Sequence, residues 1–579
     1  MDNRFEQEEQ ERIGPQAPAV RTSRRKLLAS IGMAGVALAA AGIPGGRTAY
    51  AKDKKTDDDC IIAVPSVTAL LALDTTLLDD GQIVRVLSVF ATYPGGASAL
   101  SLPMDANGGG EFVWKASAPK SGHNGGVVIS ATVPWSGTVA GLPAFLAGGG
   151  ETNPTGNGCW VRVSGGAVNP TWFGAIMDGT TDNGVPLSAA IAYAVSSGRR
   201  SIVLPKGVCA TSASPNWGYS YLSVRGAGKH DTVLKYTGSG RAFTIDGSPF
   251  GPSVIYGISV EDLTIEGNAG ITDLLFTENA SHLVIRNVNL REANSATGTA
   301  LKLLWTVASV FESVTCSVNE QPMTNRPYTG IHIGKSPSRN LRSTCNTFIN
   351  PIIEGLTGIG IRIADGDQNT FVGGTSEAIG IHGVVVAPGS RFNSFSGLGF
   401  EGNGTDDVMD QGQFTKLINC YSARKLHFAV GSLNAEVSGG LHERIQTDAG
   451  ARHTRIEKLT VNYWNTSAGG VYDNGEDSTI RDIFDHDANQ FLYVKKPRAG
   501  IAVGATPFTY TNNGGLLQQV AVRGGTVTQV LFKRGTDQTI VGGGSSGLPA
   551  NNLYTLASGD ELVVSYSAAP EMFTIPMGI

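Results

Sequence analysis

Residues Asn369 to Glu377 read NTFVGGTSE, and the same pattern occurs on both sides of this stretch. NTFINPIIE runs from Asn346 to Glu354, and NSFSGLGFE runs from Asn393 to Glu401. The three copies begin 23 and 24 residues apart. A short period that contains several strand-like runs and turns is typical of a solenoid, in which each repeat is one coil stacked on the last. The pattern therefore predicts that the chain completes one coil per repeat.

Two further sets of strand-like runs repeat at a similar interval. ISVEDLTI, HLVIRNVNL and ASVFESVTC align Leu263, Val288 and Val314, which are 25 and 26 residues apart. A second column aligns the first glycines of GIHI, GIRI and GVVV, namely Gly330, Gly360 and Gly383. Leucine-rich repeats have a similar period, but their leucine and asparagine signature is missing. Successive parallel strands would lie about 4.8 Å apart, so we expect equivalent residues to form columns.

The composition is typical of a β-rich extracellular protein. The 579 residues include 76 glycines, and only 16% of residues are charged. The net charge of −5 and the lack of a basic stripe argue against a nucleic-acid partner. Six cysteines are widely scattered, with no Cys-x-x-Cys motif or histidine cluster. We therefore expect mostly buried free thiols and no metal site.

The N-terminus is typical of an export signal. A twin-arginine stretch around Arg24-Arg25 precedes a weakly apolar run from Leu27 to Ile43, and Ala49-Tyr50-Ala51 follows. This resembles a twin-arginine signal peptide over residues 1–51, which predicts a secreted or cell-surface protein without a membrane segment after cleavage. A membrane anchor is the alternative, but the run is short, rich in glycine and alanine, and broken by Pro44.

Composition and pattern divide the rest of the chain into three parts. Residues 52–168 should form a charged linker and a small β-rich head, which contains GGGEFVWKA and GCWVRV. Residues 169–496 should form the solenoid, beginning with an amphipathic helix from Pro186 to Val195. Residues 497–579 contain runs such as TVTQVLFK and ELVVSYS that alternate apolar and polar residues between turns. This alternation predicts an antiparallel β-sandwich.

Several of these segments carry a family resemblance. WFGA, the pair Asp178-Gly179, Asp182, the helix and a strand ending in Leu-Pro-x-Gly resemble the start of β-helices in the pectate-lyase superfamily. The preceding glycine-rich segment resembles the head of phage tailspike and capsule-depolymerase proteins. The resemblance departs at Met177 and Asn183, where aspartate is common. It implies an all-β protein with a right-handed, single-stranded parallel β-helix, a polysaccharide partner and assembly as a homotrimer.

The repeat places Glu354, Glu377 and Glu401 in one column of carboxylates. Two carboxylates about 5 Å apart repel by roughly 3 kcal/mol at an effective dielectric constant of about 20. A retained proton relieves this repulsion, which leaves the acid and base that glycoside hydrolysis requires. Adjacent rungs give a spacing near that of retaining enzymes, about 5 Å, and Glu354 and Glu401 approach the inverting range, about 9.5 Å. We therefore predict these glutamates as catalytic, with the acid and base unassigned.

The main competing interpretation of these glutamates is a solvated edge of the solenoid. Glu266-Gly267-Asn268 shows the same Glu before a turn without any catalytic context. Other polar residues on the same coils are candidate substrate-binding residues: Asp365, Asp367, Arg362 and His382. Further carboxylates at Asp406, Asp407 and Asp410 are expected in turns in any case. Four aromatic residues fall in rung or loop positions where a sugar ring could stack: Trp305, Tyr328, Tyr421 and Trp464.

The favoured function is a secreted, polysaccharide-active protein, with glycoside hydrolysis preferred over other chemistry. A hydrolase needs no cofactor, whereas a polysaccharide lyase would add a base such as Arg362 or His382 and, as an option, Ca²⁺. An epimerase acting on uronate polymers and a non-catalytic glycan-binding surface protein are also consistent with the sequence. One scaffold carries all of these functions, so the fold does not decide among them.

Overall fold

A computed structural model describes residues 62–92, 108–250, 254–464, 469–492, 498–513, 517–544 and 552–576. The predicted signal peptide and the charged linker over residues 52–60, with Cys60, lie outside these residues. The other five cysteines are free, and all except Cys345 are buried, which confirms the expected thiols for this part of the chain. Within the described ranges, no helix is long and apolar enough to cross a membrane.

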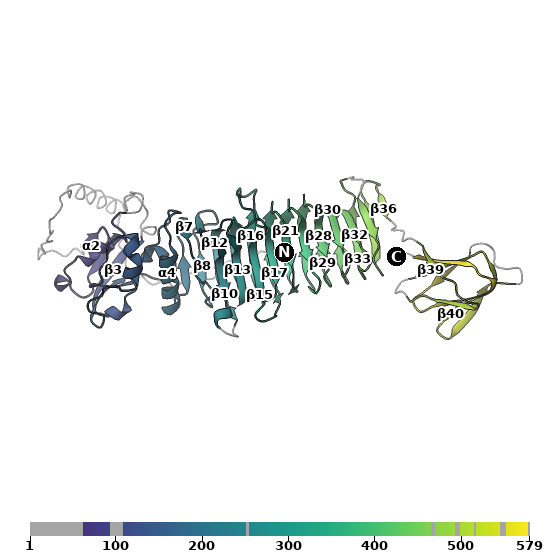
Figure 1. Ribbon diagram of the computed structural model, residues 1–579, viewed down its shortest axis with the longest axis horizontal. Helices are drawn as coiled ribbons and strands as arrows, with labels where there is room; N and C mark the ends of the chain where they lie inside the picture. The colour runs from purple at the N-terminus through teal and green to yellow at the C-terminus, as the bar shows by residue number, and fades with distance from the viewer. Residues whose placement is uncertain are drawn as a thin grey trace, which may run out of the picture. The chain divides into compact units, whose positions relative to one another are not determined.

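Thirty-one strands, β6 to β36, form one continuous sheet that is parallel except at its last pair (Figure 1). A typical coil, or rung, consists of β23 (Thr370–Val372), β24 (Thr375–Glu377) and β25 (His382–Val386). Each strand pairs with its equivalent in the preceding rung and in the next one. This pairing confirms the predicted parallel β-helix.

The rungs build three faces, which we call sheets 1, 2 and 3. Sheet 1 is formed by β6 (Ser201–Val203), β8 (Ser223–Arg225), β12 (Ser259–Glu266), β14 (Val284–Arg291), β16 (Val310–Ser317), β19 (Thr347–Ile349), β23, β26 (Ser394–Ser396), β29 (Lys416–Ile418), β31 (Glu436–Ser438), β33 (Arg455–Val461) and β35 (Thr479–Asp485). Sheet 2 is formed by β7 (Gly207–Thr211), β9 (Thr232–Tyr236), β20 (Ile352–Glu354), β24, β27 (Gly399–Glu401), the first residues of β30 (Tyr421–Phe428) and β32 (Leu441–Thr447), and the second halves of the longer sheet 1 strands. Sheet 3 is formed by β10 (Gly240–Asp246), β13 (Ile271–Ser281), β15 (Thr299–Val307), β17 (Thr329–Gly334), β21 (Ile359–Ile363), β25, β28 (Asp406–Asp410), the ends of β30 and β32, and β34 (Gly470–Asp473).

The remaining elements flank this coil along the chain. A five-stranded head sheet contains β1 (Ile62–Val64), β2 (Ile83–Ser88), β3 (Gly108–Pro119), β5 (Asn157–Arg162) and β4 (Val128–Ser130). Helix α4 (Gly184–Ser196) buries the predicted apolar face of Leu187, Ala190, Ile191 and Ala194. Two antiparallel four-stranded sheets follow the β-helix in the sequence: β37 (Ala499–Ile501), β44 (Glu571–Pro576), β39 (Gln518–Arg523) and β42 (Asn552–Leu556), then β38 (Phe508–Thr511), β43 (Glu561–Ala568), β40 (Thr526–Arg534) and β41 (Asp537–Gly542). One apolar cluster contains residues of both sheets, as expected for a sandwich.

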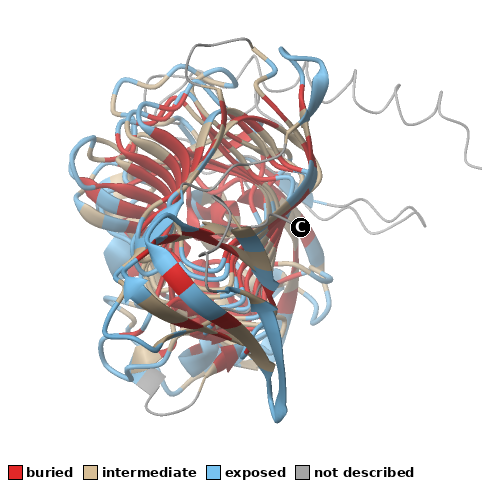
Figure 2. Ribbon diagram, turned by 90° about the vertical axis from the view of Figure 1, so that its right-hand side faces the viewer, coloured by how far each residue is buried: buried red, intermediate tan, exposed pale blue. Residues whose placement is uncertain are grey.

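The predicted side-chain columns hold the centre of the β-helix together. Asn346 Nδ2 donates to Asn369 Oδ1 at 2.9 Å, and Asn369 Nδ2 donates to Asn393 Oδ1 at 3.0 Å. All three asparagines are fully buried, so these bonds satisfy amides that would otherwise be costly. The phenylalanines two residues further on stack with ring centroids 4.4 and 4.9 Å apart. Figure 2 shows buried residues concentrated on the strands and exposed residues on the turns and loops.

Residues in the left-handed conformation turn the chain from sheet 1 into sheet 2. Gly373 and Gly397 occupy this corner with φ of 62° and 68°, and Asn350 and Asn419 occupy it in neighbouring rungs with φ of 50°. Glycine adopts this conformation without steric cost, and asparagine tolerates it better than most residues. The short corner keeps the asparagine and glutamate columns in register, because every rung turns at the same point.

Replacing Asn369 with alanine should lower the free energy of unfolding by about 1–3 kcal/mol, because it removes the buried side-chain hydrogen bonds that join Asn369 to Asn346 and to Asn393. The shift is measured as the urea midpoint followed by circular dichroism. Thr370, the next residue in the chain, is only half-buried, so Thr370→Ala is the matched control and should change the midpoint little. Equal midpoints for the two variants would contradict a stabilising asparagine ladder.

Candidate active site

The three predicted glutamates form one column at the end of sheet 2. In the parallel pairs of β20, β24 and β27, Glu354 lies opposite Glu377, and Glu377 lies opposite Glu401. The residue before each glutamate is buried in the core, so the glutamate side chains point to the outer face. Neighbouring strands lie about 4.8 Å apart. The geometry of the predicted column is therefore confirmed.

Charges in the same column are paired nearer the N-terminus. Glu266 lies opposite Lys235 and Arg291, and its carboxylate is 3.6 Å from a nitrogen of each. Among the described residues, neither Glu354, Glu377 nor Glu401 has a basic partner within ion-pair distance. The three uncompensated carboxylates are thus distinct from the rest of the column.

The three carboxylates have different surroundings. Glu354 accepts hydrogen bonds from the Ser317 hydroxyl, from Asn319 Nδ2 at 3.3 Å and from Thr375 Oγ1 at 3.4 Å. Glu377 is half-buried, and its pKa is raised by burial and then by the charges of Glu354 and Glu401. Glu401 is exposed to solvent. Glu377 is therefore the member of the column that favours keeping a proton.

Aromatic side chains adjoin the column on its C-terminal side. Tyr421 lies opposite Gly399 in the next rung, and its pKa is raised by burial and by the charges of Glu401 and Glu377. The ring of Trp464 meets Tyr421 edge to face at 5.1 Å. Tyr463 contacts Trp464 at 5.2 Å and His486 at 4.5 Å. We call Tyr421, Tyr463, Trp464 and His486 the aromatic cluster. The repeat in the sequence did not identify Tyr463 and His486 as candidate site residues.

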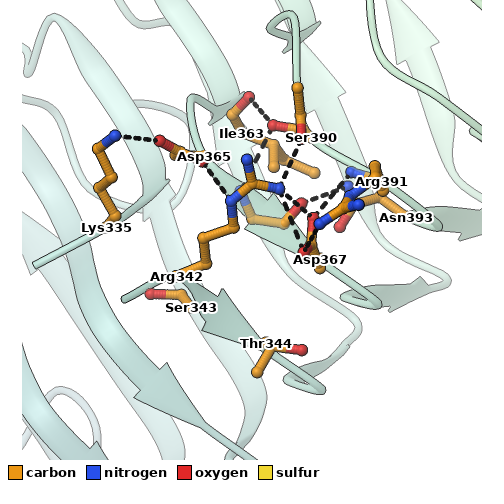
Figure 3. Close-up of polar contacts among 12 residues, drawn as sticks. Lys335, Arg342, Ser343, Thr344, Ile363, Asp365, Asp367, Ser390, Arg391 and Asn393 are labelled. Atoms are coloured by element: carbon orange, nitrogen blue, oxygen red, sulfur yellow. Dashed lines mark hydrogen bonds and ion pairs between the residues drawn. The ribbon is translucent and has the colours of Figure 1, made fainter. Parts of the chain in front are cut away.

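Two predicted substrate-binding residues are engaged elsewhere (Figure 3). Asp365 pairs with Lys335 at 3.2 Å and Arg342 at 2.7 Å. Asp367 pairs with Arg342 at 3.0 Å and Arg391 at 3.2 Å. This network lies at the corner between sheets 3 and 1, so the whole of β21, about 16 Å long, separates it from the glutamates. The structure does not bring Asp365 and Asp367 to the glutamate column.

The other two predicted substrate-binding residues lie on sheet 3. Arg362 is exposed and in register with His332 and Val385. The pKa of His332 is lowered to about 4, chiefly by burial and then by the nearby charges of Lys302 and Arg362. His382 begins β25, and its Nδ1 lies 3.3 Å from a carboxylate oxygen of Asp406. Neither Arg362 nor His382 contacts a glutamate of the column through a described hydrogen bond or ion pair.

His382 belongs to a cluster that the repeat did not reveal. Asp406, whose side chain is 3% exposed, also contacts Lys425 at 2.7 Å and His427 at 3.4 Å. His427 reaches Asp448 through Nε2 at 2.9 Å. Burial opposes ionisation of Asp406, but hydrogen bonds from His382, His427 and Lys425 outweigh it and hold its pKa far below its usual range. The hydrogen bond to Asp406 raises the pKa of His427. We call these five residues the Asp406 cluster.

The expectation that Asp406, Asp407 and Asp410 lie in turns is wrong, because all three belong to strand β28. Asp407 and Asp410 point inward. Asp407 accepts hydrogen bonds from Asn403 and Ser422, and Asp410 accepts them from Thr415 and Ser432. Burial raises the pKa of both carboxyl groups. Both residues therefore fasten turns, and neither faces a surface on which a glycan could lie.

Metal ligands and cavities among the described residues do not point to another candidate site. No group of three histidine, cysteine, aspartate or glutamate side chains among them is arranged to hold a metal ion. One cavity lies in the head, around Thr68 and Phe90, and another lies in the C-terminal sheets, around Arg498 and Phe573. The glutamate column lies instead on an open strand surface, which suits an extended polymer.

Comparisons with known proteins match the head to a family and the chain to several solved structures. Residues 63–165 match the family described as a phage tail protein small four-stranded β-sheet domain. No curated protein matches the chain. Among solved structures, the tailspike protein 2 enzymatically active domain of bacteriophage CBA120 is 13% identical with a TM-score of 0.46, covering 89% of this chain and 86% of that one.

Two bacterial structures are similar at the same level. WceF of Pantoea stewartii, a glycan biofilm modifying enzyme with a tailspike-like parallel β-helix, is 14% identical with a TM-score of 0.39, covering 88% of this chain and 72% of that one. The A-module of the mannuronan C-5 epimerase AlgE4 of Azotobacter vinelandii is 17% identical with a TM-score of 0.41, and the match covers 54% of this chain and 99% of that one. By its own strand pairing, the chain is a parallel β-helix protein.

Proposed function

We propose that the protein is a glycoside hydrolase that cleaves a polysaccharide lying across sheet 2. The observation that carries this proposal is the column of three in-register glutamates without a basic partner among the described residues. Glycoside hydrolysis requires one carboxyl group that keeps its proton and one that stays ionised. The raised pKa of Glu377 suits the acid, and the solvent around Glu401 suits the ionised partner.

The spacing of the pair favours a retaining reaction. Neighbouring strands are about 4.8 Å apart, near the separation of about 5–5.5 Å typical of retaining enzymes. Glu377 donates its proton to the glycosidic oxygen as that bond breaks, and Glu401 bonds to the anomeric carbon. Glu377, now a carboxylate, then takes a proton from water, and the resulting hydroxide displaces Glu401 and regains the same stereochemistry. Glu354 acts on Glu377 through its charge.

The function is tested by incubating the purified protein with a panel of polysaccharides. We expect new reducing ends and, by NMR, initial products that retain the anomeric configuration of the polymer. Absorbance from unsaturated uronates would indicate a lyase instead. Products with the inverted anomeric configuration would instead indicate that Glu354 and Glu401, which lie two rungs apart, are the catalytic pair. Binding without any product would leave only a glycan-binding protein.

Replacing Glu354 with Gln should move the basic limb of the kcat/KM profile to lower pH. The charge of Glu354 is one cause of the raised pKa of Glu377, so removing that charge lowers the pKa of the acid and deprotonates it earlier. The profile is measured by reducing-end release across the pH range. Glu266→Gln, in the same column but paired with Lys235 and Arg291, should leave the limb unmoved. An unshifted limb in Glu354→Gln would contradict the assignment of Glu377 as acid.

A further inference from the structure

We infer that the polymer on sheet 2 is uncharged, and that its sugar rings stack on the aromatic cluster beside the glutamate column. This inference rests on the proposed function and adds the class of substrate. It combines two independent features of the same face. One is the column of three carboxylates, none of which has an ion-pair partner among the described residues, and the other is the group of rings that adjoins it.

The charges of this face disfavour an acidic polymer. Basic residues on the preceding rungs already have carboxylate partners, as Arg291 has Glu266 and Lys229 has Glu320. A uronate placed over the column would lie one rung spacing, about 5 Å, from several carboxylates, which should weaken binding by about tenfold or more. Polymers with a negative charge on most sugars would meet this repulsion at every subsite along the column.

The aromatic cluster supplies what an uncharged ring needs. Apolar faces and aromatic side chains make up most of the contact surface in ligand sites, and polar groups then orient the ligand. Tyr421 lies opposite Gly399, which has no side chain, so the space next to its ring on this face is not filled by a neighbour in that strand. Trp464 is held in place, because its backbone N–H donates to the buried carboxylate of Glu443 at 3.0 Å. A platform ordered before binding loses little entropy when a sugar docks.

The position of the cluster sets the direction of the polymer. Tyr421 belongs to the rung after Glu401, and the other rings follow toward the C-terminal end of the β-helix. A chain that stacks on Trp464 and Tyr421 and then crosses Glu401 and Glu377 therefore runs along the helix axis. The aromatic cluster would hold the sugars on one side of the cleaved bond.

The inference is tested with pairs of polymers that differ only in charge. Alginate, polygalacturonate and hyaluronan are each compared with their carboxyl-reduced forms, and galactomannan, mannan and dextran serve as uncharged polymers. Binding of the full chain is measured by affinity electrophoresis. We expect binding to uncharged forms, and at least tenfold weaker binding to any acidic form at low salt. A tighter complex with an acidic form than with its reduced form would overturn the inference, as would failure to bind any uncharged polymer.

Two sets of variants test the two features separately. Trp464→Ala should weaken binding by about thirtyfold, as truncation of a central aromatic residue typically does. Trp305→Ala, also a half-buried tryptophan but on sheet 3, is the matched control and should bind as the wild type does. The triple variant Glu354→Gln, Glu377→Gln, Glu401→Gln should reduce the ratio of the affinity for an uncharged form to the affinity for the matching acidic form. Glu266→Gln should leave this ratio unchanged. Equal preference in the triple variant and the wild type would overturn the electrostatic part.

The outcome separates this inference from the proposed function. Uncharged polymer that binds through Trp464 without release of reducing ends would refute the hydrolase and leave the substrate class standing. Reducing ends released from an acidic polymer, with none from its carboxyl-reduced form, would leave the hydrolase standing and refute the substrate class.

Discussion

Glu377→Gln should lower the rate of reducing-end release by about 10²–10⁴-fold, the usual contribution of a positioned general acid and base. The amide is close in size and shape to the carboxyl group but has no proton to give to the glycosidic oxygen. Binding of the polymer should change little, so the loss should appear in kcat rather than in KM. The rate is measured on the polysaccharide that the panel identifies, with enzyme in excess where turnover is slow.

The control for this experiment lies in the same column. Glu266→Gln removes a glutamate from the same strand position, but one whose charge is balanced by Lys235 and Arg291. Its activity should match that of the wild type. A Glu377→Gln protein that keeps more than a tenth of the wild-type rate would refute the proposed acid, and equal losses in both variants would point to a general effect of the column on folding.

The repeat in the sequence predicted the coil and its columns. Equivalent positions in successive rungs of a β-helix become neighbours regardless of the path of the other residues in each rung. Asn369, Phe371 and Glu377 each have a partner one repeat before and one after, and the structure places all three in register. The contact of Asp367 with Arg391 follows the same repeat. Arg391 lies 24 residues further along the chain, one repeat away, and forms an ion pair with it.

Only part of the aromatic cluster and of the Asp406 cluster could be predicted in this way. Tyr421 and Trp464 were expected where a sugar ring could stack, and His382 and Asp406 lie one repeat apart in register. The other members had no comparable signal: Tyr463, His486, Lys425, His427 and Asp448. Between Ser422 and Lys425, β30 contains a register shift relative to β32, so residues after it no longer follow the face expected from simple alternation. His427 therefore reaches Asp406 and Asp448 at different rungs. Trp464 comes from a loop that meets Tyr421 from outside the sheet. Such contacts depend on loop paths, which periodicity does not specify.

Asp406→Asn should lower the free energy of unfolding near neutral pH by about 3–5 kcal/mol, the typical cost of removing one partner from a buried ion pair. Asp406 is the common partner of His382, Lys425 and His427, and its side chain is 3% exposed. The amide keeps the shape of the side chain but leaves Lys425 without its carboxylate. The loss is measured as a shift of the urea midpoint. Asp482→Asn, at an exposed position of β35, is the control and should shift the midpoint little.

The pH dependence of this difference tests the role of His427. Its pKa is raised in the folded protein by Asp406, so its stabilising contribution is present below its ordinary value of 6.5 and is lost as pH rises through the raised value. The pKa of Asp406 is depressed, so its contribution would be lost only in strong acid. The midpoints of wild type and Asp406→Asn should therefore differ more at pH about 6 than at about 9. His332 and His442, whose pKa values are lowered to about 4, oppose this trend in both proteins and cancel in the difference. A difference that is the same at both pH values would show that His427 gains nothing from Asp406.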